Sequence, residues 1–169
     1  MGSNRGWYAQ LAARLGSLVV AIDYDEIVVD RLFHDARRDN LYLLPLVMDV
    51  RNPSPASGLC SSELGSATER LKCDLGIAMA LIHHLVFDFR LTFDQVVNLT
   101  SAFTERALLI EFVSREDQWV GWRFKKQHFA AQHSWYTLKN FQDSLARKYR
   151  SISVLPSETA SRQLLLCEK

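Results

Sequence analysis

Short unbroken apolar runs recur along the chain, and each run ends at a polar side chain. The runs with the residues that follow them are 18–22 before Asp23, 41–48 before Asp49, 75–82 before His83, and 106–110 before Glu111. Strands that are half exposed alternate apolar and polar residues, whereas strands buried on both faces are apolar throughout. The pattern therefore predicts buried strands with polar residues at their ends.

Segments with helical spacing lie between these runs, at residues 7–15, 26–38, 93–103, 119–129 and 137–148. Alternating strands and helices predict an α/β fold, Rossmann-like, with a mainly parallel sheet and helices on both faces. Two apolar runs near the end of the chain are separated by turn residues and predict a closing antiparallel hairpin. We expect strands near residues 18–22, 41–48, 74–82, 106–112, 151–155 and 162–167.

Composition and charge narrow the function classes. The 169 residues are 48% hydrophobic and 23% charged, which is typical of one compact domain over residues 1–169. The 20 basic and 19 acidic residues nearly cancel, which argues against a nucleic-acid or anionic-membrane partner. No apolar run reaches the roughly 20 residues needed to span a membrane. With no signal-peptide pattern and three cysteines without paired spacing, we expect a cytoplasmic protein.

Asp23 is the first candidate for a ligand site, because open parallel sheets bind ligands at the carboxyl ends of their strands. A carboxylate in this place can accept hydrogen bonds from both hydroxyls of a ribose. The alternative role is a cap for the helix at 26–38. The glycine-containing turn at residues 2–6 favours the ligand site, because glycines let backbone approach a ligand and the following helix offers free N–H groups.

The order of the motifs resembles a class I S-adenosylmethionine-dependent methyltransferase over nearly the whole chain. The motifs that carry this resemblance are residues 2–6, 19–23, 46–49, Asp74 with 80–85, and 109–113. More narrowly, residues 52–55 and 80–85 resemble a bacterial branch often labelled nodulation-protein-like. The resemblance implies methyl transfer from S-adenosylmethionine to an acceptor that the sequence does not identify.

The resemblance also implies a set of cofactor-binding residues. They are Gly2, Asn4 and Gly6 in the turn beneath the methionine part, Asp23 at the ribose, Asp49 at the adenine amino group, and Val50 with its backbone N–H at the adenine ring. His83 and His84 follow the fourth strand of the family, where side chains face the methyl group and the substrate. We therefore expect these two histidines to be catalytic.

A general-base role suits either histidine, because imidazole titrates near neutral pH. The alternative is a purely structural role, in which the histidine forms a hydrogen bond at a strand end. Adjacent residues rarely chelate one ion together, and no His-x-x-x-His or paired cysteines supply further ligands, so we expect no metal site.

The chain departs from the family in one respect, because it begins in the glycine turn without the family's first strand. In the family that strand lies between the second and fourth strands, so its loss would leave two neighbours unpaired. Either the sheet closes up, or a segment is absent from this chain. A non-catalytic methyltransferase-like remnant or interaction module is therefore the alternative function, and a strand from another copy could fill the gap in a homodimer.

Two further segments are candidates for the acceptor side. The Pro-rich loop at residues 52–58 is either a working loop or a plain surface connection, and we expect it to converge with His83 and His84 on an acceptor pocket. The aromatic and basic stretch at residues 119–136 predicts an amphipathic helix with a buried aromatic face. Alternatively it forms a surface for stacking bases or a substrate wall.

Overall fold

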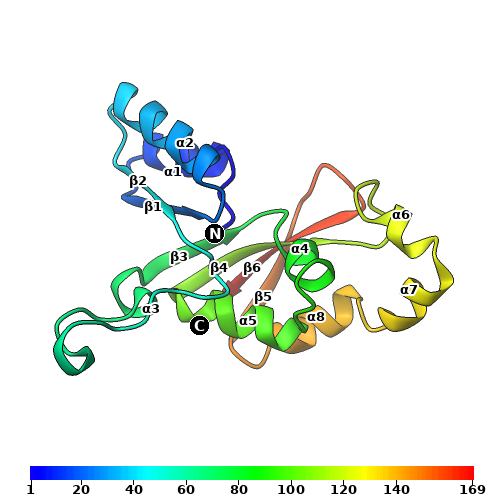
Figure 1. Ribbon diagram of the computed structural model, residues 1–169. Helices are drawn as coiled ribbons and strands as arrows, with labels where there is room; N and C mark the ends of the chain where they lie inside the picture. The colour runs from blue at the N-terminus through cyan, green and yellow to red at the C-terminus, as the bar shows by residue number, and fades with distance from the viewer. The chain divides into compact units, whose positions relative to one another are not determined.

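The computed structural model describes residues 1–169, and the chain divides into two compact units (Figure 1). Unit 1 comprises Met1–Lys72, and unit 2 comprises Cys73–Lys169. Each unit has its own sheet, with the order β1-β2 in unit 1 and β3-β4-β6-β5 in unit 2. That residues 1–169 form a single domain stays a prediction.

All six predicted strands are present. They are β1 (Val19–Asp23), β2 (Leu43–Val47), β3 (Cys73–Ala78), β4 (Thr104–Val113), β5 (Ser151–Leu155) and β6 (Arg162–Glu168). The helices are α1 (Trp7–Arg14), α2 (Glu26–Arg38), α3 (Ala67–Arg70), α4 (Ile82–Phe87), α5 (Phe93–Ala102), α6 (Gly121–Phe124), α7 (Gln127–Gln132) and α8 (Leu138–Leu145), with a short 3-10 turn η1 (Leu59–Ser61). None of these helices is long and apolar enough to cross a membrane.

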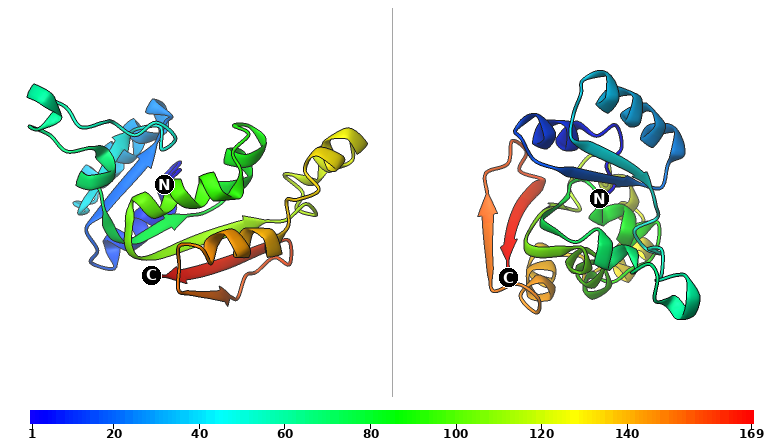
Figure 2. Two further views of the ribbon diagram at one scale, coloured as in Figure 1. Left: turned by 90° about the horizontal axis from the view of Figure 1, so that it is seen from below. Right: turned by 90° about the vertical axis from the view of Figure 1, so that its left-hand side faces the viewer.

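Unit 1 is a parallel strand pair covered by two helices. Asp23 of β1 lies opposite Val47 of β2, so the carboxyl ends of both strands meet at one edge. In all views α1 and α2 lie on the same side of this pair (Figures 1 and 2). Val29, Leu32 and Ala36 are buried, and their spacing of three and four residues forms the apolar face of α2.

Unit 2 is a four-stranded mixed sheet. β3 and β4 are parallel, while β6 is antiparallel to both β4 and β5, which confirms the predicted C-terminal hairpin. Phe93 of α5, Phe112 of β4 and Phe141 of α8 have ring centroids 5.0 to 6.3 Å apart, so α5 and α8 pack side by side on β4. With its parallel pairs, covering helices and antiparallel hairpin, the predicted α/β fold class is confirmed.

The strand predicted at residues 74–82 is shorter than expected. β3 ends at Ala78, Ala80 has a left-handed φ of 48°, and Ile82 already begins α4. The amide of Ala80 donates to Glu111 Oε2 at 2.8 Å, a contact across 31 residues that fixes the turn. His83 and His84 therefore lie on a helix and not at a strand end.

The predicted helix at residues 119–129 is also divided. α6 spans only Gly121–Phe124, and Lys126 adopts an extended conformation before α7 begins at Gln127. The predicted buried aromatic face is confirmed only in part. Phe124 and Phe129 are half-buried and pack edge to face against Phe87 of α4, and Tyr136 is buried, but Trp119 and Trp122 are exposed.

Gly6 is required by packing between α1 and α2. Its φ is +73°, and a Cβ at this position would lie 2.4 Å from Cδ1 of Leu32, a side chain that is 1% exposed. Gly16 has a similar φ of +89°, but no atom lies within 4 Å of the place that a Cβ would take there. Substituting alanine at both positions therefore distinguishes backbone strain, which occurs at both, from steric overlap, which occurs at Gly6 only.

We predict that Gly6→Ala lowers the free energy of unfolding more than Gly16→Ala does. Left-handed backbone costs an L-residue about 1–2 kcal/mol, and overpacking adds about 1–3 kcal/mol at Gly6 only. Urea denaturation of both variants measures the difference. Equal losses would show that Leu32 does not enforce glycine at position 6.

Candidate functional site

The predicted glycine turn lies at the carboxyl end of β1. The amide of Ser3 donates to the carbonyl of Ile22 at 2.9 Å, and the amide of Asn4 donates to Asp23 Oδ2 at 2.7 Å. Gly2 and Asn4 have left-handed φ values of 62° and 46°, so the chain curls sharply before α1 begins. The turn and the ribose candidate are therefore held together by direct hydrogen bonds.

Asp23 is 9% exposed, and both of its carboxylate oxygens accept backbone N–H groups. Oδ2 bonds Asn4, and Oδ1 accepts from the amide of Asp25 at 3.1 Å. A carboxylate has about four acceptor positions, so each oxygen keeps capacity for one further donor, such as a ribose hydroxyl. The cap of α2 is Asp25, which accepts from the amides of Ile27 and Val28, so the capping alternative for Asp23 is wrong.

Two features of the turn suit an anionic group. Gly6 precedes α1 without any side chain capping the helix, which leaves the amides of its first turn available to a ligand. The hydroxyl of Ser3 is buried without a hydrogen-bond partner, an arrangement that is costly unless something else bonds it. These residues fit an amino-acid carboxylate beside a ribose, and the roles given to Gly2, Asn4, Gly6 and Asp23 stay predictions.

Asp49 lies beyond the end of β2, at the same edge of the sheet as Asp23. Oδ1 accepts from the backbone amide and from Nε of Arg51 at 2.9 and 2.8 Å, and Oδ2 accepts from a terminal guanidinium nitrogen at 2.5 Å. The hydrogen bonds from the Arg51 side chain lower the pKa of Asp49, although partial burial opposes them. Val50 between them is 8% exposed, so the predicted adenine residues sit on an anchored turn.

Unit 2 holds the two predicted catalytic histidines on α4. His84 Nδ1 is 2.8 Å from Asp88 Oδ2, and the other oxygen of Asp88 is 2.7 Å from the guanidinium of Arg123. The hydrogen bonds from His84 and Arg123 lower the pKa of Asp88 overall, although burial tends to raise it. A carboxylate that holds one imidazole nitrogen leaves the other nitrogen free for proton transfer.

His83 has a different environment from its neighbour. It is 8% exposed, its Nδ1 is buried without a hydrogen-bond partner, and its ring centroid lies 4.2 Å from that of His84. Burial, and then the nearby charges of His84 and Arg162, lower the pKa of His83 to about 4. His83 is therefore neutral at neutral pH and is a weak base.

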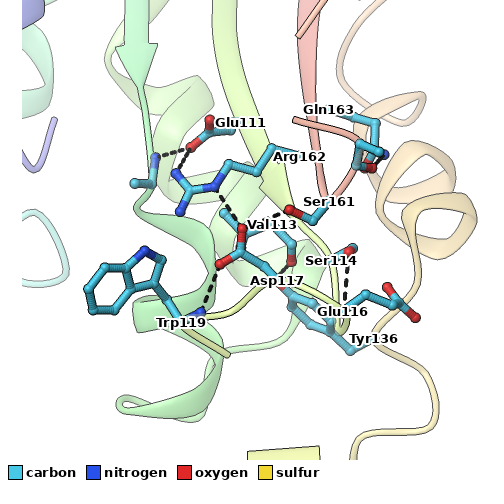
Figure 3. A network of polar contacts seen from close by, with 12 residues as sticks. Glu111, Val113, Ser114, Glu116, Asp117, Trp119, Tyr136, Ser161, Arg162 and Gln163 are labelled. Atoms are coloured by element: carbon cyan, nitrogen blue, oxygen red, sulfur yellow. Dashed lines mark hydrogen bonds and ion pairs between the residues drawn. The ribbon is translucent and has the colours of Figure 1, made fainter. Parts of the chain in front are cut away.

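A partly buried ionic network ties β4 to the start of β6 (Figure 3). Arg162 lies between two carboxylates, with Nε 2.9 Å from Asp117 Oδ2 and a terminal nitrogen 3.4 Å from Glu111 Oε2. Asp117 also accepts from the hydroxyl of Ser161 and the amide of Trp119. The sequence pattern predicted a strand end at Glu111. It did not predict that Asp117 and Arg162 form an ion pair, because these residues are 45 positions apart.

The structure thus groups the predicted site residues by unit. The six cofactor-binding candidates lie in unit 1, at the carboxyl end of its sheet, and the two histidines lie in unit 2. The loop at 52–58 and the histidines belong to different units, so their convergence on one acceptor pocket stays a prediction. The chain contains no group of three or more His, Cys, Asp or Glu residues that could hold a metal ion.

Sequence comparison finds one informative relative. No protein-family model matches the chain. The chain is 30% identical over 121 residues to "Nodulation protein NoeA" of Rhizobium meliloti (strain 1021), a match that covers 71% of this chain and 25% of that protein. The chain therefore spans about a quarter of the length of this relative. The match agrees with the nodulation-protein-like resemblance of residues 52–55 and 80–85.

Solved structures with similar folds are methyltransferases. The bifunctional kinase-methyltransferase WbdD has a TM-score of 0.65 at 16% identity, over 98% of this chain and 33% of that chain. Magnesium protoporphyrin IX methyltransferase (ChlM) from Synechocystis PCC 6803, solved with bound SAH, has a TM-score of 0.64 at 13% identity, over 99% and 71%. An O-methyltransferase candidate from Nostoc punctiforme PCC 73102 has a TM-score of 0.63 at 13% identity, over 99% and 49%.

The pKa of His83 predicts a loss of stability in mild acid. Above pH 6.5 the imidazole is neutral in both the folded and the unfolded chain, so it makes no pH-dependent contribution. As the pH falls from 6.5 to about 4, the unfolded chain binds a proton on His83 that the folded chain does not. Each pH unit in this window then lowers the free energy of unfolding by up to about 1.4 kcal/mol.

Urea denaturation of the natural chain and of His83→Gln at pH 4, 5, 6 and 7 isolates this contribution. We expect the natural chain to lose stability more steeply than the variant between pH 6.5 and 4, because glutamine does not titrate. Parallel curves for the two chains would contradict the assignment of a buried neutral imidazole.

Proposed function

We propose that this chain, which has the fold of the class I S-adenosylmethionine-dependent methyltransferases, binds S-adenosylmethionine and transfers its methyl group to an acceptor. The observation that supports this most is the carboxyl edge of unit 1. There Asp23 keeps acceptor capacity on both carboxylate oxygens, beside a curled turn and an uncapped helix start. Solved neighbours with this fold include one with bound SAH.

Within unit 1, each part of the cofactor has a candidate partner. The amides of the first turn of α1 and the hydroxyl of Ser3 suit the methionine carboxylate. Asp23 suits the two ribose hydroxyls, and Asp49 with the Val50 amide suits the adenine edge. Once bound, the cofactor supplies a methyl group that its positively charged sulfur already activates for displacement.

His84 is the proposed general base. Asp88 accepts a hydrogen bond from Nδ1–H, which fixes the tautomer that leaves Nε2 with its lone pair. Arg123 holds Asp88 from the other side, and the His84 side chain is 55% exposed and open to an acceptor. Nε2 would take the proton of the acceptor as its oxygen or nitrogen attacks the methyl carbon.

His83 is not suited to the same task, because its buried ring is neutral and weakly basic. We therefore propose that, of the two predicted catalytic histidines, His84 moves the proton and His83 shapes the wall beside it. The acceptor itself is unidentified, and we propose that the loop at residues 52–58 helps to bind it. The free thiols of Cys60, Cys73 and Cys167 suit a reducing compartment such as the cytoplasm.

A second candidate function is a non-catalytic interaction module, and the sheet edges favour it. β1 pairs only with β2, and β3 pairs only with β4, so each has an unpaired edge. Unpaired edges recruit strands, and a homodimer formed through one of them would appear as a dimer in sedimentation. Failure to bind S-adenosylhomocysteine together with dimerisation would favour this candidate.

We predict that the chain binds S-adenosylhomocysteine in a calorimetric titration and that Asp23→Ala abolishes most of the binding. The variant removes two hydrogen bonds to a charged acceptor, each worth about 1.5–3 kcal/mol, so affinity should fall by about 100-fold or more. Asp30→Ala is the matched control, because this carboxylate lies exposed on α2 of the same unit. Equal affinity of Asp23→Ala and the natural chain would exclude Asp23 from the cofactor site.

We predict that His84→Ala lowers turnover of an acceptor by about 10²–10⁴-fold, which is the usual contribution of a general base. Affinity for S-adenosylhomocysteine should not change, because the cofactor candidates lie in unit 1. Asp88→Asn should lower turnover in the same direction, because the amide no longer fixes the tautomer of His84. His83→Ala serves as the comparison, with a smaller loss.

The outcome that would reject this assignment is a loss of cofactor affinity in His84→Ala with unchanged turnover of the bound cofactor. The histidines would then belong to the cofactor site and not to the acceptor side. Turnover is followed by the release of S-adenosylhomocysteine, with whichever hydroxyl or amine compound a screen identifies as the acceptor.

A further inference from the structure

We propose that Arg51 is a positioning residue for the adenine end of the cofactor site, where it makes Asp49 selective for the exocyclic amino group. This inference rests on the proposed function, because it concerns the same cofactor. It adds a role for a side chain that the resemblance leaves without one. Arg51 would act only through Asp49, and not by touching the reacting atoms.

The contacts between the two residues form a closed local clamp. Arg51 donates to Asp49 three times, once from its backbone amide and twice from its guanidinium. The carbonyl of Asp49 also accepts from the amide of Asn52 at 3.0 Å, which closes the turn. The clamp therefore forms within four consecutive residues of unit 1.

The clamp leaves the Asp49 carboxylate with one unused hydrogen-bond acceptor position. Three of its roughly four acceptor positions are used, two on Oδ1 and one on Oδ2, so the remaining position lies on Oδ2. The guanidinium keeps the carboxylate ionised and therefore unable to donate a hydrogen bond. Such a group attracts an N–H donor and gains nothing from a C–H at the same place.

The exposure and the restrained orientation of the Asp49 carboxylate allow it to select for an N–H donor on a ligand. Asp49 and Arg51 have side chains about one-third exposed, so the free position on Oδ2 is accessible while the guanidinium fork restrains the carboxylate. A fork of two parallel hydrogen bonds fixes a carboxylate plane better than a single ammonium contact can. Preorganised acceptors bind more tightly because less conformational freedom is lost on binding.

The test compares two ligands in calorimetric titrations with the full chain. One is S-adenosylhomocysteine, and the other is its analogue with hydrogen in place of the adenine amino group. The ratio of the two affinities reports the hydrogen bond to Asp49 alone, since the ribose and amino-acid parts are identical. The variants are Arg51→Ala, Arg51→Lys and, as a control, Arg14→Ala. Arg14 makes an equally short ion pair with Asp39 elsewhere in unit 1.

We expect the natural chain to prefer the amino-bearing ligand by about tenfold or more, as one hydrogen bond to a charged acceptor provides. Arg51→Ala should lower affinity for that ligand and bring the ratio close to one, while affinity for the analogue stays nearly constant. Arg51→Lys should recover only part of the preference, and Arg14→Ala should keep all of it. A merely structural role of Arg51 would weaken both ligands equally.

Three results would overturn the inference. Unchanged preference in both Arg51 variants would show that Asp49 needs no clamp. Tighter binding of S-adenosylhomocysteine by Arg51→Ala would show that Arg51 competes with adenine for the carboxylate. Failure of the natural chain to bind either ligand would reject the proposed function itself, and this inference with it.

Discussion

Carboxylates at or near the ends of strands accept backbone N–H groups from neighbouring loops, and the path of these loops within each unit depends on this interaction. Asp23 holds the amides of Asn4 and Asp25, Asp49 holds that of Arg51, and Glu111 holds that of Ala80. Hydrogen bonds to a charged acceptor are about twice as strong as neutral ones. Each carboxylate therefore fixes the path of a loop where the strand ends, which is also where a parallel sheet binds ligands.

The apolar runs were enough to predict the strands, and they placed Asp23 and Asp49 correctly at the carboxyl ends of β1 and β2. Runs such as 18–22 and 151–155 are set by local composition, and the structure has strands within two residues of most predicted ends. The proximity of Asp23 to the turn at residues 2–6 could also be predicted from the sequence, because each lies next to a helix or strand with a clear hydrophobic pattern. Their contact follows from the parallel topology, in which the chain returns to the same edge after each helix.

Contacts distant in sequence account for what the pattern missed. The run at 75–82 remains apolar past the true end of β3, where the chain turns at Ala80 and the Ala80 amide donates a hydrogen bond to Glu111. Because that run was predicted as a strand, the helical spacing of four between His84 and Asp88 was not recognised. The partners Asp117 and Arg162 are brought together by the final hairpin, and nothing local indicates either of them.

The central claim is that the carboxylate of Asp23 organises a loop that receives the adenosyl cofactor, and a backbone amide titration tests it most directly. Nuclear magnetic resonance of the ¹⁵N-labelled chain would follow the amides of Asn4 and Asp25 as S-adenosylhomocysteine is added. The account predicts saturable shifts of both with one dissociation constant, while the amide of Arg150, bonded within the hairpin, stays in place. Saturating ligand that leaves the Asn4 and Asp25 amides unmoved would contradict it.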